Sequence, residues 1–359
     1  MSERIYVIAE AGVNHNGDLE LARRLIEAAA AAGADAVKFQ SFKADSLVSR
    51  SAPKAPYQLK STDQSESQYQ MIRKLELSEV DHSTLIEHCK ANGIEFLSTP
   101  FDHSSLSLLA NELNVSRIKV SSGDLTNAPL LLAAARTGKP LILSTGMSSV
   151  GDIEVALGVL AFGYTKSEEP ASTEVFEHAY ASPEGQAALR ERVTILHCTT
   201  EYPAPFADVN LRSMNTLAGT FGLPIGYSDH TVGISIPIAA AALGAAIIEK
   251  HFTLDRTLPG PDHKASLEPD ELKQMVTAIR EIELSLGSTV KRAAPSELKN
   301  RDVARKSIVA SRDIRKGELF SEGNLTAKRP GGGLHPVRYW DFLGKVAERD
   351  YLADEKISS

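Results

Sequence analysis

The sequence predicts an α/β protein built on a (β/α)8 TIM barrel and followed by a small β-rich domain. About eight apolar runs of β-type residues alternate with segments of helical periodicity. Each apolar run stops at a polar or charged residue, and in such barrels the carboxyl ends of the strands carry the active site. The chain has 359 residues, more than the roughly 250 that one barrel needs, which leaves room for a second domain.

The predicted strands are short and end in residues with chemical function. In chain order the apolar runs are Ile5–Ala9, Ala36–Val37, Ile94–Leu97, Ile118–Val120, Leu141–Leu143, Val193–Leu196, Ile225–Tyr227 and Ala246–Ile248. The residues that follow them are Glu10, Lys38, Ser98, Ser121, Ser144, His197, Ser228 and Glu249. Carboxylates, lysines, hydroxyls and imidazoles on one rim suit an anionic substrate and a divalent metal.

A helical pattern lies between most of these runs. The first helix has clear ends, because Asp18 can cap its start and Gly33 can end it. The predicted helices are Leu19–Ala32, Val80–Ala91, Ser104–Leu113, Pro129–Arg136, Val150–Ala161, Leu211–Phe221, Ile236–Leu243 and Pro269–Leu286.

Two connections are unusually long. The first, Ser41–Leu77, leaves the second strand on the catalytic side and is interpreted as a lid, with a surface loop as the alternative. The second, Gly163–Arg192, precedes the sixth strand and so lies on the opposite face of the barrel. Its polar composition predicts a solvated insertion that takes no part in the site.

The barrel pattern predicts a first domain at 1–288, a charged linker at 289–304 and a small β-rich domain at 305–359. A domain of about 55 residues is marginal alone and would lean on the barrel or on a partner chain. Its cationic, Gly-rich segment Lys328–Gly333 is a surface turn unless it can reach a barrel mouth.

Composition excludes several classes of protein. The net charge of -7 argues against nucleic acid as a partner, because phosphate binding needs a basic face. Two cysteines, Cys89 and Cys198, give no disulfide framework and fit a reducing cytoplasm. No apolar run is long enough for a signal sequence or a bilayer span, so a cytoplasmic location without membrane association is expected.

His230 and His251 follow the predicted seventh and eighth strands. Neighbouring strands lie ~4.8 Å apart, so the two imidazoles could share one divalent ion with open positions for substrate and water. The alternative is that each histidine only forms hydrogen bonds, because catalytic zinc usually has three protein ligands. His197, after the sixth strand, ranks behind them as a candidate.

Lys38 and Lys119 belong to the second and fourth strands. A lysine at the inner end of a barrel strand is costly unless an anion pairs with it. The hydroxyl donors around them are Thr99, Ser122 and Ser228. Together they predict a phosphate or carboxylate pocket, against the alternative of simple ion pairs with Glu10 or Glu249. Glu10 and Asp124 are the candidate acid/base groups.

With these residues assembled, the chain resembles the sialic acid synthases, which condense phosphoenolpyruvate with a sugar and include N-acetylneuraminate and N,N'-diacetyllegionaminate synthases. The matching motifs are Ile8–Gly17, Val37–Gln40, Ser98–Phe101, Leu143–Met147, His197–Pro203, Gly226–Thr231, Glu249–Phe252 and Gly260–His263. The tail resembles the antifreeze-like (SAF) domain of those enzymes, best at Arg329–Gly331.

The resemblance implies condensation of phosphoenolpyruvate with an open-chain, N-acetylated mannose-type sugar. It implies a metal on His230 and His251, manganese first, with magnesium or cobalt as alternatives. It assigns phosphoenolpyruvate to Lys38, Thr99, Lys119, Ser122 and Ser228. It assigns the sugar to Glu10, Gln40, Tyr202 and Asp262. The implied catalytic residues are Glu10, Asp124 and Tyr202. It further implies a domain-swapped homodimer in which Arg329 enters the partner's site.

Some positions depart from the family pattern. Asp124 stands where the family usually has glutamate, which leaves its role in proton transfer open. Thr200 stands where some members have asparagine. The stretches Lys54–Gln58 and Cys198–Phe206 look like both sugar subgroups. N-acetylmannosamine is therefore the first expectation, and 2,4-diacetamido-2,4,6-trideoxymannose is the alternative.

Two other classes compete with this interpretation. A metal-dependent barrel aldolase or 3-deoxy sugar acid synthase would share the rim but would not need the SAF-like tail. A non-catalytic sugar-binding or ice-binding protein could be built around the tail, but it would not need lysines, carboxylates and histidines on the barrel rim.

Overall fold

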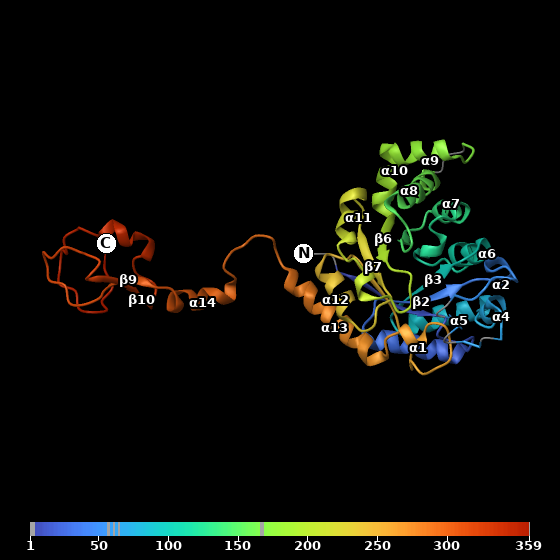
Figure 1. Ribbon diagram of the computed structural model, residues 1–359, viewed down its shortest axis with the longest axis horizontal. Helices are drawn as coiled ribbons and strands as arrows, with labels where there is room; N and C mark the ends of the chain where they lie inside the picture. Colours follow the sequence, from blue (N-terminus) through green and yellow to red (C-terminus); the bar gives the residue numbers. More distant parts are fainter. Residues whose placement is uncertain (1–3, 56–57, 60–61, 64, 166–168, 359) are drawn as a thin grey trace. The chain divides into compact units, whose positions relative to one another are not determined.

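The computed structural model describes residues 4–358 apart from 56–57, 60–61, 64 and 166–168. The chain forms two compact units, Met1–Gly287 and Ser288–Ser359 (Figure 1). The first unit is an eight-stranded, all-parallel sheet in the order β3-β2-β1-β8-β7-β6-β5-β4, with β3 and β4 in contact at the seam. The predicted (β/α)8 barrel is thereby confirmed.

The strands agree closely with the predicted runs. They are β1 (Tyr6–Gly12), β2 (Ala36–Ser41), β3 (Glu95–Pro100), β4 (Ile118–Val120), β5 (Leu141–Ser144), β6 (Val193–Cys198), β7 (Ile225–Asp229) and β8 (Ile247–His251). Apolar side chains fill the barrel interior in a cluster of their own. Its buried members are Ile8, Ala36, Leu97, Ile142, Leu196 and Ile247.

The helices form the outer layer of the barrel. They are α1 (Leu19–Ala32), α2 (Ala44–Leu47), α4 (Gln68–Arg73), α5 (Glu79–Ala91), α6 (His103–Ser107), α7 (Ala128–Arg136), α8 (Val150–Tyr164), α9 (Thr173–Ala181), α10 (Pro183–Arg192), α11 (Ser213–Phe221), α12 (Ser235–Ala242) and α13 (Pro269–Leu286). Within the described residues, no helix combines the length and apolar character needed to cross a membrane.

Local chemistry sets the helix ends. The Asp18 carboxylate accepts hydrogen bonds from the backbone N–H groups of Glu20 and Leu21, which caps α1. Gly33 then ends the helix at φ 83°, in the left-handed region that favours glycine. The predicted helix Ser104–Leu113 is less regular than expected, because α6 is short and passes into a π-helical turn at Leu108–Glu112.

The segment 163–192, predicted to be a solvated insertion, has regular structure that its composition did not reveal. The described part of this segment is mostly helical, and α9 and α10 lie beside α8 (Figure 1). The rings of Phe162 on α8 and Phe176 on α9 meet edge to face at 5.3 Å. A Cβ atom on Gly158 would stand 3.0 Å from the Phe176 carbonyl oxygen, so α8 and α9 pack closely. The physical reason is that α8 is apolar around most of its circumference and needs a second covering layer.

The second unit, Ser288–Ser359, is small and largely irregular. A helix, α14 (Pro295–Ala304), occupies most of the segment that was predicted to be a linker. Beyond it, β9 (Ser307–Ala310) and β10 (Leu325–Lys328) pair in antiparallel fashion, and α15 spans Tyr339–Phe342. Its core is a compact cluster built around Ile308, Ile314, Phe320, Leu325, Phe342 and Tyr351.

Replacing Phe176 with alanine tests whether α9 supports the barrel. Because this half-buried ring covers α8, we expect Phe176→Ala to lower the free energy of unfolding by about 1–3 kcal/mol, measured by chemical denaturation. The neighbouring exposed residue supplies the control, Glu177→Ala, which should change stability little. Equal stability of the two variants would show that the packing of α9 on α8 does not stabilise the barrel.

Candidate active site

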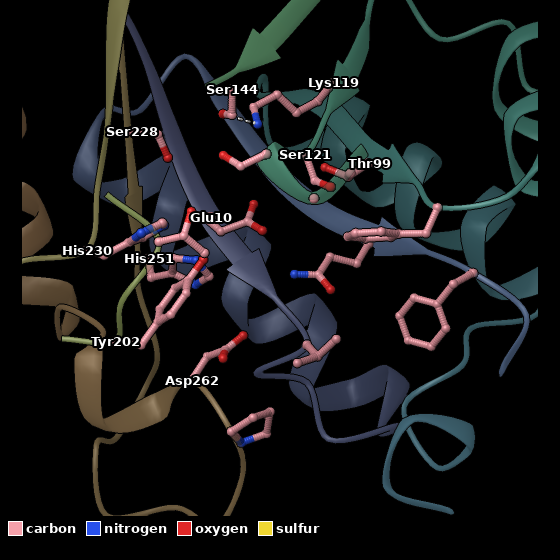
Figure 2. Close-up of a pocket in the computed structure, with 18 of the residues that line it drawn as sticks. Glu10, Thr99, Lys119, Ser121, Ser144, Tyr202, Ser228, His230, His251 and Asp262 are labelled. Atoms are coloured by element: carbon pink, nitrogen blue, oxygen red, sulfur yellow. Dashed lines mark hydrogen bonds between the residues drawn. The ribbon is translucent and has the colours of Figure 1, made fainter. Parts of the chain in front are cut away.

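A cavity of about 430 Å³ opens among the βα loops at the carboxyl ends of the strands (Figure 2). It brings together most of the residues that the sequence predicted. Those lining it are Glu10, Lys38, Gln40, Thr99, Lys119, Ser122, Tyr202, Ser228, His230, His251 and Asp262. Asp124 is not among its lining residues.

The register of β1 places Glu10 at the centre of the site. Glu10 pairs with Lys38 on β2 and with His251 on β8. The ladder shifts between Glu10 and Gly12, and Gly12 adopts φ 54°. A Cβ atom there would stand 3.3 Å from Glu10 Oε1 and 3.5 Å from both Gln40 Nε2 and His251 Cε1. Glycine at this position therefore keeps the space beside Glu10 open.

Two lysines and two glutamates form a buried network of ion pairs. Lys38 Nζ lies 2.7 Å from Glu10 Oε2 and 3.7 Å from Glu249 Oε2. Lys119 Nζ lies 3.5 Å from Glu249 Oε1. All four side chains are buried, so their charges interact strongly. The lysines thus form the ion pairs with Glu10 and Glu249 that the sequence offered as the alternative to an anion pocket. The cavity nevertheless remains open beside these pairs.

Burial and neighbouring charge shift the pKa values of this network in opposite directions. Burial raises the pKa of Glu10 above its ordinary value, because Lys38 only partly offsets the loss of solvent. Burial acts the same way on Glu249, but Lys119 and Lys38 outweigh it and bring the pKa of that carboxyl below its usual range. Glu249 is therefore the fixed counter-charge, and Glu10 is the carboxyl that can carry a proton.

Hydroxyl groups surround the two ammonium groups. Lys38 Nζ donates to Thr99 Oγ1 at 3.1 Å, and Lys119 Nζ donates to Ser144 Oγ at 2.6 Å. Ser228 Oγ donates to Glu249 at 2.8 Å. In Figure 2 Lys119, Ser144, Ser121 and Thr99 lie on one side of the cavity. Convergent ammonium and hydroxyl donors make this side suited to a phosphate or a carboxylate.

The two imidazoles lie on the other side, with Glu10 between them and the lysine side (Figure 2). The ring centroids of His230 and His251 are 5.5 Å apart. His230 Nδ1 donates to the Thr199 carbonyl oxygen at 2.7 Å, which leaves the Nε2 lone pair of the neutral ring free to act as a ligand. His251 Nδ1 is buried without a hydrogen-bond partner in the described structure. The ring of Tyr202 lies 4.1 Å from that of His230.

These two histidines fit a site with two protein ligands. Burial lowers the pKa of His230 to about 4 and holds the pKa of His251 well below its usual value, so both rings are neutral and able to bind a metal. Among the described residues, no group of three or more His, Cys, Asp or Glu side chains could hold an ion. Water or substrate oxygens would have to complete the coordination, as a first-row divalent ion such as Mn²⁺ allows.

Two other predicted residues occupy different settings. Asp124 accepts hydrogen bonds from Ser121 Oγ at 2.9 Å and Asn127 Nδ2 at 3.1 Å, so it steadies the turn that carries Ser122. Its catalytic role stays a prediction. Arg329 is exposed within the second unit, and its entry into a partner's site also stays a prediction.

Asp262 lies in Figure 2 on the imidazole side, near Tyr202. Burial raises the pKa of its carboxyl to about 6, only partly opposed by Lys38. Near neutral pH such an aspartate can accept a hydrogen bond from a sugar hydroxyl when it is ionised, and it can donate one when it is protonated. His197, in contrast, contacts the Val209 carbonyl oxygen and lies outside the cavity lining.

Sequence reasoning missed part of the lining. The segment between β2 and α5, predicted as a lid, supplies Leu47, Gln58, Gln68, Met71, Ile72 and Leu75. Met71, Ile72 and Leu75 follow one another at helical spacing in α4 and just beyond it, a signal that the sequence does carry. Pro56 and Tyr57 of the predicted lid lie outside the described residues.

Comparisons with known proteins identify the relatives of both units. The NeuB family model matches residues 25–291, and the SAF domain model matches residues 305–358. The chain is 54% identical to the N,N'-diacetyllegionaminic acid synthase of Campylobacter jejuni, covering 99% of each chain. It is 46% identical to the Legionella pneumophila protein of the same name, covering 94% of this chain and 89% of the relative.

A solved structure supports the same relationship. It is the N-acetylneuraminic acid synthetase of Leptospira borgpetersenii, in complex with citrate, at a TM-score of 0.66 and 35% identity. The match covers 83% of this chain and 90% of that one.

Metal binding tests the pair of imidazoles directly. We expect His230→Ala and His251→Ala each to abolish Mn²⁺ binding, measured by electron paramagnetic resonance, because a single remaining imidazole gives too few ligands. His197→Ala is the control, since this histidine lies on the adjacent strand β6 but outside the cavity lining, and it should retain binding. Unchanged Mn²⁺ affinity in the first two variants would contradict the assignment.

Proposed function

This chain belongs to the NeuB family, and we propose that within the family it is an N,N'-diacetyllegionaminate synthase. The proposed reaction joins phosphoenolpyruvate to 2,4-diacetamido-2,4,6-trideoxymannose, consumes water and releases phosphate. The observation that carries the choice of sugar is the similarity over nearly the whole chain to two proteins of that name. N-acetylmannosamine was the first expectation from the sequence, and these relatives favour the alternative instead.

N-acetylneuraminate synthase is the second candidate. The Leptospira structure supports it, but at 35% identity it is more distant than the two legionaminic acid synthases. Both candidates use phosphoenolpyruvate and the same type of aldehyde, so the lysine side and the imidazole side of the cavity would serve either one. The difference must arise where the rest of the sugar binds.

The lysine side suits phosphoenolpyruvate. This substrate carries a phosphate and a carboxylate, and buried ammonium groups with hydroxyl donors bind such groups strongly. Lys38 and Lys119 are each already held by a neighbouring hydroxyl and a carboxylate, so they need little reorganisation when the anion binds. Preorganised donors of this kind stabilise developing charge most effectively.

The condensation requires three events at three carbons, C2 and C3 of phosphoenolpyruvate and the aldehyde carbon of the sugar. C3 of phosphoenolpyruvate bonds to the sugar aldehyde carbon, water adds at C2, and phosphate leaves with cleavage of the C2–O bond. A divalent metal held by His230 and His251 would polarise the aldehyde as a Lewis acid. Lys38 and Lys119 keep the phosphate in place while it becomes the leaving group.

Proton transfer is proposed for Glu10. The aldehyde oxygen gains a proton during the condensation, and the attacking water loses one. Glu10 lies between the imidazole side and the lysine side, and its raised pKa lets it hold a proton near neutral pH. Tyr202 and Asp262 line the imidazole side, where they would orient the open-chain sugar.

The tail, the assembly and the location are also proposals. A swapped homodimer, in which Arg329 completes the partner's cavity, would explain why a cationic, Gly-rich segment is exposed in such a small unit. Two buried, unpaired cysteines agree with a cytoplasmic location.

Phosphate release from phosphoenolpyruvate with each sugar tests the proposed function. We expect the 2,4-diacetamido sugar to give the higher kcat/KM in the presence of Mn²⁺, and mass spectrometry to show diacetyllegionaminate as the product. Reactions without sugar, and with the His230→Ala variant, supply the background rate. A higher kcat/KM for N-acetylmannosamine would favour the second candidate, and no phosphate release with either sugar would refute both.

A further inference from the structure

One part of the cavity lining is unlike the charged remainder. Of the apolar side chains that form it, six are here called the apolar wall: Val13, Phe42, Met71, Ile72, Leu75 and Phe101. All except Met71 belong to one packed cluster that is separate from the barrel core. The rings of Phe42 and Phe101 meet edge to face at 6.3 Å, which gives the cluster a fixed shape.

The apolar wall comes from one arc of the barrel. Its residues follow β1, β2 and β3 or belong to the segment around α4, and these three strands are neighbours in the sheet. His230 directly follows β7, His251 ends β8, and Lys119 lies on β4, on other parts of the rim. Three amide side chains, Gln40, Gln58 and Gln68, line the cavity from the same arc as the wall.

Neither reacting group needs an apolar surface. Phosphoenolpyruvate is highly charged, and placing its phosphate or carboxylate against hydrocarbon would cost free energy without compensation. The aldehyde carbon must lie beside phosphoenolpyruvate and the imidazoles. The parts of the sugar that remain are the C2 acetamido group, which both candidate sugars share, and the far end from C4 to C6.

The two candidate sugars differ at that end. N-acetylmannosamine has hydroxyl groups at C4 and C6. The 2,4-diacetamido-2,4,6-trideoxy sugar has an acetamido group at C4 and a methyl group at C6. An acetamido group joins an amide to a methyl group, so it matches a surface of hydrocarbon flanked by glutamine amides.

We propose that the apolar wall is the specificity-determining subsite, which accepts the C6 methyl and the C4 acetamido methyl of the sugar. This inference rests on the proposed function and adds the reason for its choice of sugar. A C6 hydroxyl against Val13, Phe42 and Leu75 would lose its hydrogen bonds to water and find no replacement there. Discrimination by such a pocket is typically about 10–100-fold in kcat/KM.

The first test uses the unmodified enzyme. N-acetylmannosamine is compared with its 6-deoxy analogue, which differs only in the C6 hydroxyl, by phosphate release with phosphoenolpyruvate and Mn²⁺. If C6 lies against the apolar wall, kcat/KM should be about tenfold or more higher for the 6-deoxy sugar than for N-acetylmannosamine. An equal or lower kcat/KM for the 6-deoxy sugar overturns the proposal.

The second test changes the wall. Val13→Thr places a hydroxyl group in the wall with little change of shape, and Ile72→Thr does so while also removing one terminal methyl group. Both should reduce the preference for the 2,4-diacetamido sugar over N-acetylmannosamine by about tenfold, with the KM for phosphoenolpyruvate unchanged. The matched control is Val80→Thr, on the exposed face of α5, which should leave the preference unaltered.

The preference is a ratio within one enzyme, so a loss of folded protein cancels from it. Ile72 is only half-buried, so its variant keeps the test valid if Val13→Thr does not fold. An unchanged preference in a folded wall variant overturns the proposal while the proposed function stands. If the unmodified enzyme turns over none of these sugars, the proposed function fails and this inference falls with it.

Discussion

The burial of two lysines and two glutamates in one cavity is the constraint on which the rest of the site depends. An unpaired ammonium or carboxylate in such a place costs several kcal/mol, so each charge requires an opposite one within reach. Lys38 and Lys119 find theirs in Glu10 and Glu249, with hydroxyl groups as further partners. The network balances its own charge, and it presents two cations to any anion that enters the cavity.

The barrel turns this network into a site with three different sides. Parallel register brings Glu10 opposite both Lys38 and His251, so one carboxyl adjoins the cations and the imidazoles at once. Gly12 keeps the space beside that carboxyl open. The apolar wall follows β1, β2 and β3, the strands that also carry Glu10, Lys38 and Thr99. Anion binding and carbonyl activation are thereby assigned to different sides of the cavity, and the apolar wall adds a third surface beside them.

The sequence predicted the strand ends well because parallel strands in a barrel are buried on both faces and read as apolar runs that stop at a polar residue. Lys38 was found in this way, and Lys119 and His251 were found because they lie close to such strand ends. Packing between distant segments was harder to predict. The helices of 163–192 were taken for a solvated insertion, because polar composition hid their contact with α8. The apolar wall was missed because part of it comes from the long connection between β2 and α5. This connection has no strand register from which the position of Met71 could be predicted.

Calorimetry of phosphoenolpyruvate binding tests the central claim, that the buried lysines form the anion site, most directly. Lys38→Met or Lys119→Met should weaken binding by about 1–3 kcal/mol, the scale of a lost charge-assisted contact. Lys139→Met, which alters a half-buried lysine before β5 that lies outside the cavity lining, should bind phosphoenolpyruvate as the unmodified protein does. Unchanged affinity in the two buried-lysine variants, with the fold intact, would contradict the account.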